Sequence, residues 1–100
     1  MQTFEKALEI FKGYLELETE LDVVKSRFGY IRIELDVGVD YCGGVICHTP
    51  EELFEQLLSD YQGYEEMQLT KGCRDLTVED EKRVAVLCQR YRERWEEESV

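Results

Sequence analysis

The sequence predicts an α+β domain from three observations. Apolar residues recur at helical spacing from Thr3 to about Val24, and residues 30–37 alternate between apolar and polar as a half-buried strand does. Two capping signals, TPEE at 49–52 and TVED at 77–80, then start two further helices. One hundred residues suffice for one modest core, so we expect a single domain over residues 1–100, with helices covering one face of a sheet.

The first predicted element is a long N-terminal helix from Thr3 to about Val24. Gly13 weakens it by roughly 1 kcal/mol relative to alanine, which allows a bend at that position. Its buried side combines two adjoining apolar stripes, which consist of Phe4, Leu8, Phe11 and Leu15, and of Ala7, Ile10, Tyr14, Leu17, Leu21 and Val24.

A two- or three-stranded antiparallel sheet should follow. In the strand at 30–37 we expect one buried face and one solvent-exposed face. The buried face should contain Ile31, Ile33, Leu35 and Val37, and the exposed face Tyr30, Arg32, Glu34 and Asp36. Gly38 and the pair Gly43-Gly44 offer positions for positive φ, and the glycine pair predicts a two-residue hairpin turn.

The two C-terminal helices have the clearest local signals. Thr49 can cap, Pro50 suits the first helical position, and Glu52 can reach back to the Thr49 amide. We expect this helix to end at Gly63 and a polar connection to run over 64–76, with a short extended piece at 67–70. Its predicted buried stripe contains Leu53 or Phe54, then Leu57, Leu58 and Tyr61.

The last helix should run from Val78 to about Glu97, capped by Thr77 with Asp80 at the third position. Arg90, Arg92 and Arg94 fall outside its apolar stripe. That stripe consists of Val84, Leu87, Cys88, Tyr91 and Trp95.

Charge limits the classes of partner. The formal net charge is -11, and residues 1–66 hold 15 acids against 5 bases, whereas residues 67–100 hold 8 against 7. Such a chain is repelled by DNA, RNA and anionic membranes and attracted to basic proteins. With no apolar run near the roughly 18 residues of a membrane span and no secretory signal at the start, we expect a cytoplasmic protein with reduced thiols.

The sequence gives little support for catalysis. Cys42, Cys47 and His48 form no paired short spacing typical of structural zinc, and no third residue completes a nucleophilic set. Cys88 fits a small buried hydrophobe on the last helix, and Cys73 stands apart from the other thiols. We therefore expect no enzyme, no metal and no cofactor.

The remaining signal is an acidic surface. In LELETELD, residues 15–22, the carboxylates occupy every second position, and a solvated helix face that only confers solubility is the plain alternative. If acids and tyrosines from several elements converge, they form a partner-binding surface. The predicted residues are Glu16, Glu18, Glu20, Asp22, Tyr30, Glu34, Asp36, Asp40 and Tyr41.

A small, strongly acidic chain ordered helix, short antiparallel strands, helix, helix resembles the anti-CRISPR proteins of phages and mobile elements, which inhibit the type II CRISPR nuclease. The likeness covers the whole chain as size, charge and element order, without a residue motif. Some members of that group fill the basic site that reads the short DNA motif beside the target. The resemblance implies DNA mimicry against a nuclease with its guide RNA, and the arginines at 90, 92 and 94 should then face away from the partner.

A second function class is a self-associating structural or regulatory module without catalysis. The broad apolar side of the long first helix, and the pair Tyr91 and Trp95, could meet the same residues across a two-fold axis in a homodimer.

Overall fold

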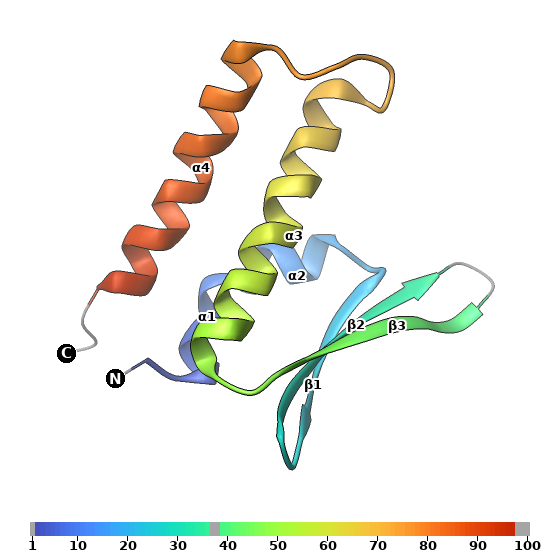
Figure 1. Cartoon of the computed structure of the whole chain (residues 1–100), viewed down its shortest axis with the longest axis vertical. Coiled ribbons are helices and arrows are strands. Elements are labelled where there is room, and N and C mark those ends of the chain that lie inside the picture. Colours follow the sequence, from blue (N-terminus) through green and yellow to red (C-terminus); the bar gives the residue numbers. More distant parts are fainter. Residues whose placement is uncertain (1, 37–38, 98–100) are drawn as a thin grey trace. The chain divides into compact units, whose positions relative to one another are not determined.

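The computed structural model is α+β and describes residues 2–36 and 39–97, with side chains at 2–35 and 43–97. The elements follow the order α1, α2, β1, β2, β3, α3, α4 (Figure 1). The chain divides into two compact units, Met1–Gln56 and Leu57–Val100, and the boundary falls within α3. The expectation of one domain stays a prediction.

The predicted long N-terminal helix is wrong. Two short helices, α1 (Phe4–Ile10) and α2 (Lys12–Leu17), meet at Phe11, and the chain then enters strand β1 (Leu21–Ser26). A helix through Asp22 would have placed like charges four residues apart and carboxylates near its negative C-terminal end. Pairing with β2 instead satisfies the backbone of this segment, which contains the β-branched pair Val23-Val24.

The sheet has three antiparallel strands in the order β1-β2-β3. Strand β2 (Gly29–Asp36) confirms the predicted strand, and β3 spans Val39–Cys47. The predicted turn at Gly43-Gly44 is wrong, because these residues lie inside β3 opposite Glu34 and Ile33. The register pairs Asp36 with Val39, so residues 37–38 connect the two strands, six residues before the predicted turn. These two residues, which include Gly38, lie outside the described residues.

The two sheet faces are assigned opposite to the prediction. Arg32 is only 9% exposed, and the ring of Tyr30 lies 4.6 Å from that of Phe4 in α1. Cross-strand partners share a face, so the side of Tyr30 and Arg32 is the inner face, which also contains the buried Leu21 and Cys47. The predicted period of two is therefore correct, but the prediction of which face is buried is wrong.

Burial of Arg32 is physically reasonable. Its cross-strand neighbours are Val23 and Val45, against which the aliphatic part of the side chain can lie. Its guanidinium donates from Nη2 to Oε1 of Glu34 at 2.8 Å, which compensates the buried charge.

The core of the first unit lies where α1, α2 and the start of α3 supply buried side chains. The rings of Phe11 and Phe54 are 5.5 Å apart, and both side chains are almost fully buried. Ala7, Ile10, Tyr14 and Leu53 are buried as well.

Helix α3 (Pro50–Thr70) begins where TPEE predicts. Thr49 Oγ1 accepts from the Glu52 amide at 3.2 Å, and Glu52 Oε2 accepts from the His48 amide rather than from Thr49. The predicted stop at Gly63 and the extended piece at 67–70 are both wrong, since the helix continues until Lys71 and Gly72 adopt positive φ. One interior glycine weakens a helix by roughly 1 kcal/mol, which the partly buried residues 64–66, 69 and 70 can offset.

Helix α4 (Val78–Glu96) confirms the TVED signal, with a capping box between Thr77 and Asp80. The rings of Tyr61 in α3 and Tyr91 in α4 lie 4.5 Å apart, which places these two helices side by side within the second unit (Figure 1). The predicted stripe is confirmed, because its members are the buried or half-buried residues of α4 from Val84 onward, and Arg90, Arg92 and Arg94 are exposed.

Candidate functional site: an acidic segment and an exposed sheet face

The four carboxylates of LELETELD, here called the acidic segment, are divided among three structural settings. Glu16 lies in the last turn of α2, Glu18 and Glu20 in the following turn, and Asp22 on β1. Glu16, Glu20 and Asp22 are exposed and Glu18 is half-buried. The acidic segment therefore wraps from a helix end onto the sheet instead of following one helix face.

Local hydrogen bonds shape the acidic segment. Asp22 Oδ1 accepts from the Val23 amide at 2.8 Å, and Glu18 Oε1 accepts from the Glu20 amide at 3.4 Å. Among the described residues, no Lys or Arg forms an ion pair with any of the four carboxylates. Their negative charge is thus presented to solvent, which favours a basic partner over internal neutralisation.

The other predicted partner-binding residues do not form one surface with the acidic segment in the described structure. Tyr30 and Glu34 lie on the inner sheet face, where Tyr30 contacts Phe4 and Glu34 pairs with Arg32. Glu34 remains about half exposed, with 52% of its side chain accessible, so part of its carboxylate still faces water. The side chains of Asp36, Asp40 and Tyr41 lie outside those that the structure describes.

A feature that the sequence analysis missed is the opposite side of the sheet, here called the outer sheet face. Ile46 is 48% exposed and Val24 is 37% exposed, and the central-strand residues between them are only half-buried. An exposed apolar surface of this kind is typical of an interaction site. The outer sheet face consists of Val24, Ile31, Ile33, Leu35 and Ile46.

One sequence signal could have revealed this face. Strands β1 and β3 each contain two adjacent branched apolar residues, Val23-Val24 and Val45-Ile46. Adjacent residues point to opposite faces of a sheet, so both faces must carry apolar side chains. The long-helix interpretation concealed the first of these pairs.

The thiols and the histidine do not assemble. Cys47 is buried, Cys73 and His48 are exposed, and Cys88 is half-buried, where burial raises the pKa of its thiol. A raised pKa keeps the thiol protonated and lowers its nucleophilicity. Within the part of the chain that the structure describes, no three His, Cys, Asp or Glu side chains gather as metal ligands. Cys42 lies outside the described side chains.

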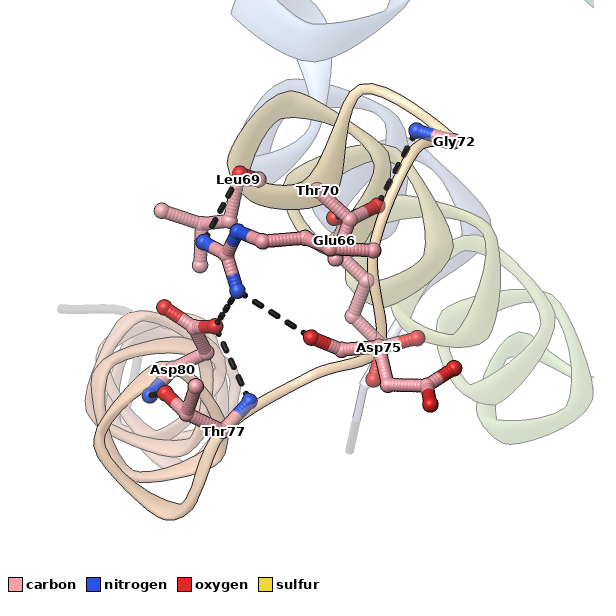
Figure 2. Close-up of polar contacts among 8 residues, drawn as sticks. Glu66, Leu69, Thr70, Gly72, Asp75, Thr77 and Asp80 are labelled. Carbon is pink, nitrogen blue, oxygen red and sulfur yellow. Dashed lines mark hydrogen bonds and ion pairs between the residues drawn. The ribbon is translucent and has the colours of Figure 1, made fainter.

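A polar cluster lies in the second unit, around the connection 71–77 and the first turn of α4. Arg74 donates to the carboxylate of Asp80 and to the carbonyl oxygens of Leu69 and Asp75 (Figure 2). The hydrogen bond from Arg74 holds the pKa of Asp80 well below its usual range, with help from the Thr77 amide. Through these hydrogen bonds the cluster ties the end of α3 to the start of α4.

This cluster leads to a prediction about acid stability. A depressed folded-state pKa means that Asp80 contributes stability above its unfolded pKa of about 3.9, and that the contribution is lost as the pH falls toward the folded value. In urea unfolding followed by circular dichroism, Asp80→Asn should therefore be less stable than the natural chain near neutral pH, and the difference should shrink below about pH 4. Because the Arg74 side chain is 47% accessible to solvent, salt should reduce the difference as well.

Asp75→Asn is the matched control, since it removes one carboxylate charge from the same polar cluster while Arg74 uses only the Asp75 carbonyl. It should change stability little at either pH. An Asp80→Asn deficit that persists unchanged in acid would contradict the proposed role of the carboxylate.

The fold and these surfaces define an acidic α+β chain with a partly exposed apolar sheet face and, among its described residues, no cluster of three metal-ligating side chains. None of the helices in the described ranges is long and apolar enough to cross a membrane. No protein-family model, curated protein or solved structure matches the chain.

Proposed function

We propose that this protein is an acidic inhibitor that binds a basic nucleic-acid-binding enzyme and occupies its nucleic-acid site. The observation that carries the proposal is the acidic segment, whose carboxylates lie at a helix end, a turn and a strand without basic ion-pair partners among the described residues. A groove lined with Lys and Arg, shaped to hold phosphates, offers the complementary charge.

A CRISPR nuclease with its guide RNA is our candidate partner, with DNA mimicry as the mode of inhibition. The formal net charge of -11 and the α+β element order support this choice. The near-neutral C-terminal third, with exposed Arg90, Arg92 and Arg94 on α4, is then the part directed away from the nuclease. In this proposal the chain acts in the cytoplasm as a binding protein without catalysis.

Charge reversal in the acidic segment tests the proposal. The triple variant Glu16→Lys, Glu18→Lys, Glu20→Lys should reduce the association rate with a basic partner by roughly tenfold or more, and added salt should slow association of the natural chain in the same direction. The measurement is surface binding kinetics on the nuclease with its guide RNA, together with a DNA-cleavage assay. A pull-down from a host lysate at low and high salt identifies the partner if that nuclease does not bind.

The matched control reverses three exposed glutamates at the end of α4, Glu93, Glu96 and Glu97, which gives the same change in net charge. It should leave the association rate much closer to that of the natural chain. Equal losses in both triple variants would show that only total charge matters and would remove the acidic segment from the proposal.

The alternative, a self-associating module, is not supported at the two surfaces that the sequence analysis named for it. The long first helix is divided at Phe11, and Trp95 is buried while Tyr91 packs against Tyr61.

A further inference from the structure

The outer sheet face raises a question that the proposed function does not answer, because its centre is apolar rather than charged. Its residues stand in cross-strand rows. One row joins Val24, Ile31 and Ile46, and the next joins Asp22, Ile33 and Gly44. On the other side of the Val24 row, toward the β1–β2 hairpin, the next row contains Ser26 and Gly29. Beyond it the chain turns at Arg27 and Phe28. Phe28 is 64% exposed, with the Arg27 guanidinium 5.2 Å from the centre of its ring.

Charge is distributed unequally along this face. Glu20 and Asp22 stand at the end where β1 begins, and the Leu35 amide donates to the Glu20 carbonyl at 2.7 Å, which fixes Glu20 beside the sheet. Arg27 stands at the opposite end, at the tip of the β1–β2 hairpin. A uniformly basic partner would match the first end and be repelled by the second.

We propose that the outer sheet face binds the same face of a second copy of this chain, with the strands of the two copies antiparallel. The two copies are related by a two-fold rotation axis that lies in the plane of the interface, perpendicular to the strands. The axis passes through the row of Val24, Ile31 and Ile46. This proposal does not depend on the inhibitor function. Its central surface is apolar, and it shares only Glu20 and Asp22, at the rim, with the acidic segment.

The two-fold arrangement is self-complementary in both shape and charge. Rows are spaced by two residues, roughly 6.6 Å, so rows equally distant from Val24 meet each other across the axis. Asp22 then falls near Ser26 of the second copy, Glu20 near the hairpin tip with Arg27, and Ile33 over Gly29, which has no side chain to obstruct it. The exposed apolar row meets itself at the centre, as in two sheets packed about 10 Å apart.

Salt dependence separates this contact from binding to a basic partner. Each copy carries a formal net charge of -11, so the two copies repel at long range and salt screens that repulsion. The central contact is apolar and the ion pairs at its rim are exposed and weak. The dimer dissociation constant should therefore stay constant or fall as salt is added, whereas charge-driven binding to a basic partner weakens.

The test compares two neighbouring residues of β3 that point to opposite faces. Ile46 lies on the outer sheet face and Val45, 42% exposed, on the inner face. Sedimentation equilibrium should show a concentration-dependent dimer for the natural chain, a dissociation constant raised by roughly tenfold or more in Ile46→Thr, and little change in Val45→Thr. Threonine keeps the β-branched shape, and circular dichroism checks that both variants fold.

A charge swap tests the orientation of the two copies. Arg27→Glu should weaken the dimer, and adding Glu20→Arg in the same chain should restore it, because Glu20 and Arg27 meet across the axis. A natural chain that remains monomeric at the highest attainable concentration would overturn the proposal. So would a dimer that is unchanged in Ile46→Thr, equally weakened in Val45→Thr, or not restored by the charge swap.

Discussion

Replacement of Gly29 by alanine should destabilise the protein by about 4 kcal/mol. Gly29 starts β2 with φ +139°, a conformation that only glycine adopts readily and that costs other residues roughly 1–3 kcal/mol. A Cβ atom there would lie against the backbone carbonyl oxygen of Cys47, far inside van der Waals contact, and relieving such overlap typically costs about 1–3 kcal/mol more. Because Tyr30 pairs with Cys47, relief would pull apart the first rungs of the β2–β3 ladder.

The measurement is urea unfolding followed by far-UV circular dichroism in dilute solution, where association does not add to stability. Gly43→Ala is the control in the same sheet, because a Cβ at Gly43 would meet nothing within 4 Å and φ is unexceptional. It should be neutral or slightly stabilising, by about 0.5 kcal/mol. A Gly29→Ala variant as stable as Gly43→Ala would mean that the β1–β2 turn or the β2–β3 pairing is incorrect.

Replacement of Phe54 by alanine should cost about 3–5 kcal/mol. Phe54 is 1% exposed on α3, and its ring faces that of Phe11, which links the end of α1 to the start of α3. The loss combines the transfer of a large apolar side chain with the cavity left behind. For a domain whose total stability is about 5–15 kcal/mol, this removes much of the margin.

Phe28→Ala is the matched control for Phe54→Ala. The same atoms are removed from the same unit, but Phe28 is mostly exposed and its only described ring contact is with Arg27. The change should be within about 1 kcal/mol of the natural chain. If both phenylalanine variants lost stability equally, the assignment of core and surface in this unit would be wrong.

Signals contained in a few neighbouring residues were predictive. TPEE and TVED placed the starts of α3 and α4 correctly, because a cap depends on side chains that reach only three residues along the chain. The alternation at 30–37 identified β2 for the same reason, since the period of two is a property of the strand itself.

Predictions were wrong where the structure of a segment depends on residues far away in the sequence. Residues 21–24 match a helical stripe as well as a strand, and pairing with β2 stabilises the strand. Gly43-Gly44 suits a turn, but the register of β2 with β3 places the connection at 37–38. Gly63 can end a helix, yet side chains further along α3 gain enough packing to continue it to Thr70. In each case propensity was weaker than tertiary contacts.

The candidate surfaces follow the same division. The net negative charge and the carboxylates of residues 16–22 belong to the sequence itself and would exist on any fold. Their distribution over a helix end, a turn and a strand, the ion pair of Glu34 with Arg32, and the exposure of Val24 and Ile46 depend on how the sheet meets α1. Alternation tells which residues share a face, but only the aromatic contact of Phe4 with Tyr30 decides which face is covered, because that contact joins residues 26 positions apart.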